Sequence, residues 1–254
     1  MRQLHPFSIN APPRIDPSGE IPDSDDDPAW RAYGVPKIER TAAWLDGSAK
    51  DLLLAAQSWT PGFNVGFAEI RGKLASAPIL GVIANTERIA GFVSVSELYR
   101  LHRTRLSVRY VHGTIAHRSL GGSKKFTRLM DTVGPRADVE LLHTQNPLMA
   151  EAERRRSADS FPDPDHSRRL TNEISADLRE LLRRELKRDP NFDPISGVSL
   201  AMYGHCLYSD WPLPGQDKYR SFLTLDPASA VLVCGFAECT IVNKALVTAL
   251  QEAA

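Results

Sequence analysis

The sequence predicts an α+β fold with a mixed, mostly antiparallel central sheet flanked by helices, and three observations lead to this fold class. Apolar, strand-like segments follow one another at 78–84, 89–98 and 106–116 with short connections between them. Segments joined by hairpin-length connectors are expected to pair antiparallel. A glycine turn at 118–123 then leads into an apolar stripe with helical spacing, and further strand-like and helical segments alternate after it.

Size, charge and cysteine use limit the kind of protein this is. The chain has 254 residues, 42% of them hydrophobic, which suits one large domain with appendages. Lysine plus arginine equals aspartate plus glutamate at 31 each, so no global charge favours a nucleic acid or a membrane as partner. Cys206, Cys234 and Cys239 have no metal-ligand spacing and are odd in number, which favours a reducing compartment. No apolar run resembles a signal peptide or a membrane span, so we expect a cytoplasmic protein without a metal site.

The first part of the chain divides into an arm and a helical region. Residues 1–36 are rich in proline, aspartate and serine and are predicted to form an extended or disordered N-terminal arm. Residues 37–254 are predicted to form a single domain. It begins with a helix over 37–59, broken near Asp46-Gly47-Ser48, and a second helix over 65–74.

The second part is predicted to complete the sheet around an inserted helix. Residues 167–188 carry an apolar stripe on a strongly charged helix, which we interpret as an insertion over about 159–190, before the last two strands. The other predicted elements are a helix at 123–133, strands at 138–144, 198–207 and 230–236, a helix at 148–156 begun by Pro147, and a closing helix at 242–253.

The glycine turn is a candidate anion site. It reads Arg118-Ser119-Leu120-Gly121-Gly122-Ser123 and is followed by Lys124 and Lys125. The start of a helix has backbone N–H groups without partners and the positive end of the helix dipole, which together suit a phosphate. The alternative is that two glycines simply connect a strand to a helix.

The longer pattern resembles the acyl-CoA-binding motif of the GNAT (GCN5-related N-acetyltransferase) superfamily. The motif appears here as Arg118-x-x-Gly121-x-Ser123, with serine in the last small-residue position, after the strand exit Ile115-Ala116-His117. The order of the elements over residues 37–158 and the Gln145-Asn146-Pro147 strand exit are also similar to the family. The resemblance implies a divergent member with a GNAT-like fold.

The resemblance also implies a cofactor and its contacts. Acetyl-CoA or another acyl-CoA is expected, with its thioester beside the middle of the central strand, where that strand diverges from its neighbour. A backbone N–H there is expected to polarise the thioester carbonyl. The residues assigned to the pantetheine arm and acyl group are Thr114, Ile115 and Ala116, those assigned to the pyrophosphate are Arg118, Gly121, Gly122, Ser123 and Lys124, and Asn146 is assigned to the cofactor arm.

Amine acylation needs a base and in some enzymes an acid. His112 and Glu97 are the candidate bases, and strand alternation is expected to place His112 on one face with Tyr110 and Thr114. The family's usual acid is a tyrosine in the helix after the fifth strand, and helix 148–156 has no tyrosine. Tyr203 is the candidate replacement, with Tyr208 as an alternative. Each of these side chains also has a purely structural interpretation.

Three functions remain open at this point. The first is an acyl-CoA-dependent N-acyltransferase, with acetyl as the expected acyl group and a small molecule or peptide amine as the acceptor. The second is a GNAT scaffold with other chemistry, such as decarboxylation or thioester processing in a biosynthetic pathway. The third is a non-catalytic CoA-sensing or partner-binding module that uses the basic helix 167–188. Dimerisation is common in the family, so a homodimer is also open.

Overall fold

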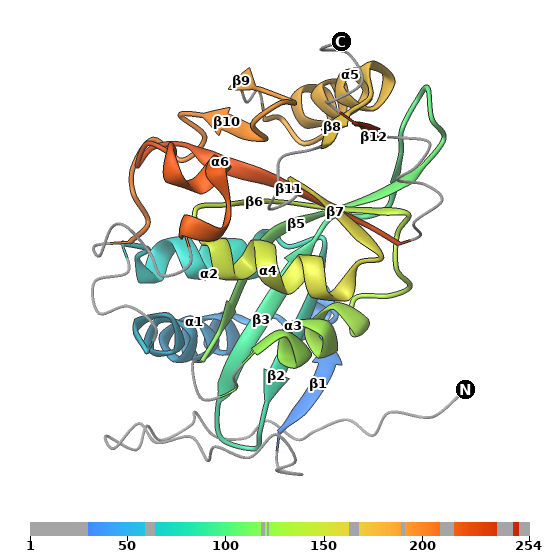
Figure 1. Cartoon of the computed structure of the whole chain (residues 1–254). Coiled ribbons are helices and arrows are strands. Elements are labelled where there is room, and N and C mark those ends of the chain that lie inside the picture. Colours follow the sequence, from blue (N-terminus) through green and yellow to red (C-terminus); the bar gives the residue numbers. More distant parts are fainter. Residues whose placement is uncertain are drawn as a thin grey trace.

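The structure is a computed structural model that describes residues 30–58, 64–117, 120, 122–162, 168–188, 191–208, 216–237 and 246–248 (Figure 1). Its strands are β1 (Arg31–Gly34), β2 (Ile79–Ala84), β3 (Ile89–Val95), β4 (Tyr99–Arg100), β5 (Ser107–Ala116), β6 (Val139–Thr144), β7 (Asp159–Phe161), β8 (Arg168–Leu170), β9 (Asn191–Phe192), β10 (Val198–Leu200), β11 (Ala230–Phe236) and β12 (Leu246–Thr248). Its helices are α1 (Ala42–Gln57), α2 (Phe67–Ser76), α3 (Gly122–Asp131), α4 (Pro147–Arg156), α5 (Asn172–Glu180) and α6 (Arg220–Leu223), with short helical turns at Lys37–Glu39, Leu181–Glu185 (η3) and Gln216–Lys218. No helix in these ranges is both long and apolar enough to cross a membrane.

The predicted fold class is confirmed. A ten-stranded sheet runs in the order β1-β2-β3-β5-β6-β11-β10-β9, with β4 beside β5 and β7 beside β11. Among the strands that the structure describes, β5 and β6 are the one parallel pair of this sheet, and the other pairings are antiparallel. The crossover between β5 and β6 is made by α3, because parallel neighbours need a long connection.

Helices cover both faces of the sheet. On β11, Val231 and Val233 pack into one cluster with α3 and α4, while Leu232 between them packs into another cluster with α5. On β3, Val93 joins the first cluster and Phe92 joins a third cluster under α1 and α2. The strand alternation therefore puts α3 and α4 on one face, and α1, α2 and α5 on the other. Figure 1 shows the sheet passing between these groups.

The last residues of the predicted N-terminal arm add a strand to the sheet. β1 pairs antiparallel with β2, from Arg31 opposite Ala84 to Gly34 opposite Gly81. The next helix, α1, begins after Thr41, whose hydroxyl accepts from the Trp44 amide at 3.3 Å. The predicted break near Asp46-Gly47-Ser48 is wrong, because the buried stripe of α1 continues through it from Leu45 to Ala49 and Leu52.

Three expectations for the last third of the chain are corrected. The inserted helix begins at Asn172 rather than 167, because Thr171 caps it and β8 precedes it. The strand predicted for 198–207 ends at Leu200, because Ala201 turns into the left-handed region with φ 53°. Residues 246–248 of the predicted closing helix form β12, which pairs with β8.

We expect Gly81→Ala to destabilise the protein, since α3 packs directly on the backbone of β2 at this position. A Cβ on Gly81 would contact the Thr132 hydroxyl and lie 3.1 Å from Val133 Cγ1 and 3.2 Å from the Leu129 carbonyl oxygen. Overpacking of this kind costs about 1–3 kcal/mol in the free energy of unfolding. Gly72→Ala in α2 is the matched control, because the new Cβ would meet nothing within 4 Å. This change should raise the free energy of unfolding by about 0.5–1 kcal/mol. Chemical denaturation measures both, and equal effects would contradict the packing argument.

Candidate active site

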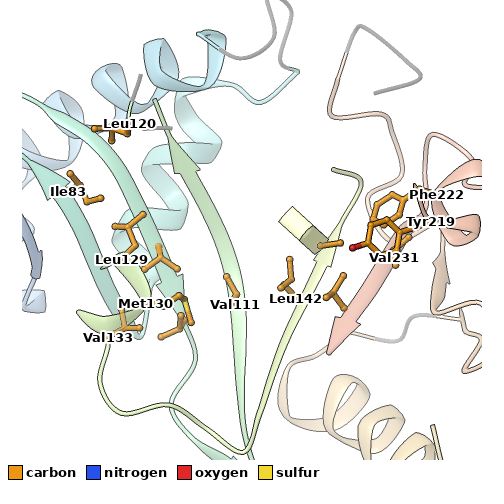
Figure 2. Close-up of a cluster of buried hydrophobic side chains, with 14 of the residues drawn as sticks. Ile83, Val111, Leu120, Leu129, Met130, Val133, Leu142, Tyr219, Phe222 and Val231 are labelled. Carbon is orange, nitrogen blue, oxygen red and sulfur yellow. The ribbon is translucent and has the colours of Figure 1, made fainter. Parts of the chain in front are cut away.

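The central strand β5 loses its parallel neighbour halfway along its length. Pairing between β5 and β6 runs from Val108 opposite Val139 to Val111 opposite Leu142 and then stops, although β5 continues to Ala116. Figure 2 shows the two strands diverging from Val111 and Leu142. The exposure follows this geometry, because residues 108–111 are buried whereas residues 112–117 are all partly exposed. One backbone edge of β5 thus has no β6 partner over residues 112–115.

A β-bulge lies where the strands separate. Val111 is opposite Val95 and Gly113 is opposite Ser94, so His112 is an extra residue in β5. A bulge shifts the alternation of side chains after it. His112 stays beside Tyr110, with ring centroids 5.1 Å apart, but Thr114 is opposite Val93 and faces the α3 and α4 side. The expectation that Tyr110, His112 and Thr114 share a face is therefore wrong for Thr114.

A chain of hydrogen bonds runs behind His112. The Tyr110 hydroxyl lies 2.8 Å from His143 Nδ1, and His143 Nε2 lies 2.9 Å from the Ser199 hydroxyl. Burial lowers the pKa of His143 to about 3, and burial together with the charge of Arg188 lowers the pKa of His112 to about 4. Both imidazoles are consequently neutral at pH 7. The partly exposed His112 has a free lone pair in this form, so it can accept a proton.

The two other catalytic candidates lie in different surroundings. The Tyr203 hydroxyl, in the segment after β10, donates to the His143 carbonyl oxygen at 2.8 Å, and burial raises the pKa of Tyr203 well above its usual range. Tyr203 and His112 thus both border the pair formed by Tyr110 and His143. Glu97 is exposed and lies beyond the end of β3 at Val95, rather than on the strand as expected.

The residues assigned to the pantetheine arm and acyl group lie along the opened half of β5. Thr114 donates its hydroxyl to the Phe92 carbonyl oxygen at 3.0 Å, Ile115 packs toward α1 and α2, and Ala116 ends the strand. Past this end, Gly122, Ser123 and Lys124 form the first turn of α3. Helical geometry leaves the backbone N–H groups of that turn without intrahelical partners. Arg118 and Gly121 lie outside the described residues.

Asn146 has a structural role at the start of α4. Its side-chain oxygen accepts from the Leu148 amide at 2.9 Å and so caps the helix. Its side chain also forms a hydrogen bond with the Tyr208 hydroxyl, which lowers the pKa of Tyr208. Burial has the larger effect and raises this pKa to about 12. Tyr208 therefore lies at the carboxyl end of β6, next to the opened part of the sheet.

Sequence reasoning missed His143, Ser199 and Arg188. His143 occupies a strand position alternate to Leu141, which lies opposite Tyr110, so its face could have been inferred from the register of β5 and β6. Ser199 and Arg188 gave no such signal. Ser199 reaches the site through the pairing of β10 with β11, and Arg188 through the turn at Lys187, and both depend on tertiary packing.

The comparisons with known proteins add little to this geometry. No protein-family model matches the sequence, and a search of curated proteins found no match. A search of solved structures matched one titled "GphF GNAT-like decarboxylase in complex with isobutyryl-CoA". The identity is 9%, the match covers 82% of this chain and 100% of that chain, and the TM-score is 0.37. Likeness at this level carries no argument about the chemistry of this chain.

Proposed function

We propose that this protein is an acyl-CoA-dependent N-acyltransferase, with acetyl-CoA as the first donor to test. One observation carries the proposal: the central strand opens one backbone edge over residues 112–115, and this edge leads toward the first turn of α3. An extended thioester arm can bond to such an edge as a strand would. The helix start supplies backbone N–H groups and dipole charge for a pyrophosphate.

The chain's own groups suit the transfer step. An acyl-CoA would supply an activated carbonyl, and a backbone N–H of residues 113–115 would stabilise the charge that develops on its oxygen. The acceptor nitrogen bonds to that carbon while the carbon–sulfur bond breaks. Neutral His112 takes the proton that the nitrogen loses, and the thiolate takes a proton from Tyr208 or from water. Tyr203 suits this last role less well, because its hydroxyl already donates to the His143 carbonyl.

Ser123→Glu tests where the pyrophosphate would bind. Ser123 is the second residue of α3. A negative side chain at this position stabilises the helix by about 0.3–1 kcal/mol through the helix dipole, but it repels a bound anion. We therefore expect unchanged or higher thermal stability together with at least tenfold weaker binding of acetyl-CoA. Titration calorimetry measures the binding, and a thermal unfolding curve measures the stability.

Ser123→Ala is the matched control, since it removes the hydroxyl without adding charge. It should bind acetyl-CoA within a few-fold of the wild-type protein. Wild-type protein that binds neither acetyl-CoA nor longer acyl-CoAs would refute the proposed function. Equal affinities for the glutamate variant and the wild type would place the pyrophosphate elsewhere.

A second candidate is a GNAT-scaffold enzyme that decarboxylates or processes a thioester. The observation that favours it is the helix after β6, because α4 has no tyrosine to protonate a leaving thiolate and the hydroxyl of Tyr203 is already engaged. Incubation with malonyl-CoA in the absence of any amine separates the two. Carbon dioxide release that depends on His112 would support this candidate, and turnover that requires an amine would support acyl transfer.

A further inference from the structure

We propose that Arg188 binds a carboxylate group of the substrate beside His112. This inference rests on the proposed function, because it concerns the same opened part of β5. It adds a property that the acyl-CoA assignment leaves open, namely the charge of the molecule that reacts there.

Arg188 is held over the floor of the site. η3 ends at Glu185, Lys187 adopts a left-handed φ of 51°, and the Arg188 amide donates to the Leu182 carbonyl oxygen at 2.6 Å. This turn places the guanidinium carbon 5.2 Å from the centre of the Tyr110 ring. A cation over a tyrosine face is attracted by the ring and keeps a defined orientation. Tyr110 is in turn packed edge-on against His112.

The guanidinium of Arg188 differs from those of other arginines that bond to the protein. Arg103 pairs with Asp177 at 3.1 Å, Arg179 donates to the Phe192 carbonyl oxygen at 2.7 Å, and Arg40 donates to main-chain carbonyl oxygens at 2.6–3.3 Å. Within the described ranges, Arg188 has neither an ion pair nor a side-chain hydrogen bond. Its contact is the aromatic face, so its N–H donors are available while the cation itself is held in place.

The charge around Arg188 favours an anionic ligand. His112 and His143 are both neutral, and the positive charge of Arg188 helps to keep them so. On the α2 side, Lys73 lies 3.7 Å from where a Cβ of Gly113 would be, and it pairs with Glu69 at 3.1 Å. That pair balances its own charge, and no carboxylate of the described residues pairs with Arg188. A planar guanidinium fork fits a carboxylate through two parallel hydrogen bonds.

The carboxylate can belong to either reactant, and binding assays separate the two sources. For the acyl group, calorimetry compares malonyl-CoA with acetyl-CoA. For the acceptor, acetylation of glycine and glutamate is compared with that of methylamine, which has no carboxylate. Charge-assisted hydrogen bonds to an arginine correspond to about tenfold to hundredfold in affinity or in kcat/KM. We expect a preference of this size for the carboxylate in one of the two arms.

Variants of Arg188 identify the residue responsible. Arg188→Met keeps the apolar stem over Tyr110 and should abolish the preference, while Arg188→Lys should keep part of it. Arg184→Met is the matched control from the same helical turn, because Arg184 is exposed and already pairs with Glu180 at 2.8 Å. It should leave the preference unchanged.

A readout without turnover makes failure of the inference distinguishable from failure of the proposed function. Succinate serves as the probe, and NMR follows the His112 ring signals of the apoprotein. Saturable shifts that persist in Arg184→Met but vanish in Arg188→Met would support the carboxylate site even if no acyl-CoA binds. Absence of any carboxylate preference in both arms, or a preference that Arg188→Met retains, would overturn the inference.

Discussion

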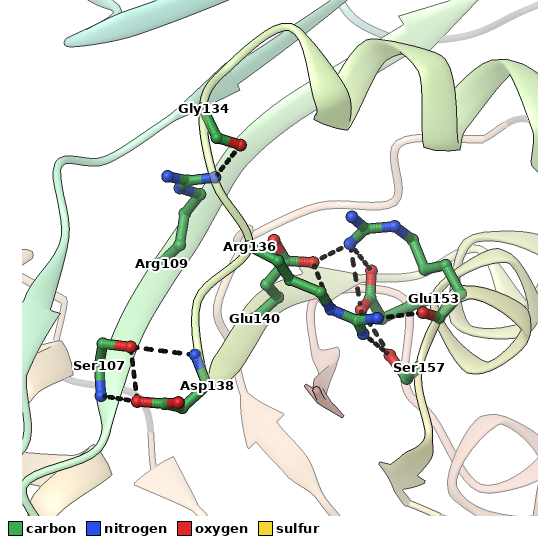
Figure 3. Close-up of polar contacts among 9 residues, drawn as sticks. Ser107, Arg109, Gly134, Arg136, Asp138, Glu140, Glu153 and Ser157 are labelled. Atoms are coloured by element: carbon green, nitrogen blue, oxygen red, sulfur yellow. Dashed lines mark hydrogen bonds and ion pairs between the residues drawn. The ribbon is translucent and has the colours of Figure 1, made fainter. Parts of the chain in front are cut away.

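Glu140→Leu is expected to lower the free energy of unfolding by about 3–5 kcal/mol, because it would remove the ion pair of Glu140 with the buried Arg156. Glu140 is fully buried on β6 and forms an ion pair with Arg156 of α4. Arg109 of β5 lies directly opposite Glu140 in the parallel register and is also buried. Figure 3 shows the polar cluster around Glu140 and Glu153, and Arg109 beside it bonded to the Gly134 carbonyl oxygen. Urea denaturation at pH 7 measures the loss.

The cluster explains why one residue cannot be removed alone. Arg156 also contacts Glu153 at 3.2 Å, and Glu153 accepts a hydrogen bond from the Ser157 hydroxyl at 2.9 Å. Gly235, which lies opposite Glu140 on β11, leaves room for these groups, because a Cβ there would collide with the Glu153 carboxylate. The carboxylates of Glu140 and Glu153 and the guanidinium of Arg156 therefore fill the space that Gly235 leaves open.

The double variant Glu140→Leu with Arg156→Met should recover at least half of the loss, since a buried ion pair can be exchanged for apolar side chains at little cost. Glu151→Gln on the outer side of α4 is the control. Its ion-pair partners Arg154 and Arg155 are exposed, and glutamine can still accept from the Tyr219 hydroxyl, so the change should stay within about 1 kcal/mol. A single-variant loss no larger than that of the control would show that Glu140 does not stabilise the arginines.

The sheet was the most predictable part of this protein. β5, β6 and β11 were predicted to within about one residue, because a buried strand needs a continuous run of apolar and β-branched residues. The apolar run that contains β12 was predicted as part of a closing helix, and this prediction was wrong. Its strand conformation depends on pairing with β8, a partner far away in the sequence, and local patterns cannot reveal such pairing.

The candidate site could be predicted in outline but not in orientation. The start of α3 follows from a local pattern, whereas the opening of β5 was expected only from the resemblance to a family. It did not predict the bulge at His112, because a bulge is a mismatch between two strands rather than a property of one. Arg188 was predicted only as the last residue of the charged helix 167–188, whereas the turn at Lys187 directs it over Tyr110.

Acidification is expected to destabilise the protein from about pH 6.5 downward, largely through His143. Burial lowers the pKa of His143 to about 3 in the folded state, from 6.5 when the imidazole is exposed. Between these values the unfolded chain binds a proton that the folded protein does not, so the free energy of unfolding falls as the pH falls. The slope approaches 1.4 kcal/mol per pH unit, and about 3 kcal/mol is lost by about pH 4. The lowered pKa of His112 acts in the same direction.

His143→Gln isolates this contribution, because every other titrating group remains in both proteins. The variant loses hydrogen bonds to Tyr110 or Ser199 and should be less stable at pH 7. Its deficit should shrink as the pH falls from 6.5 to about 4.5, since glutamine has no proton to gain on unfolding. His205→Gln at an exposed position is the control and should run parallel to the wild type. Denaturation curves across this range give the difference directly, and a deficit that stays constant with pH would mean that His143 is already protonated in the folded protein.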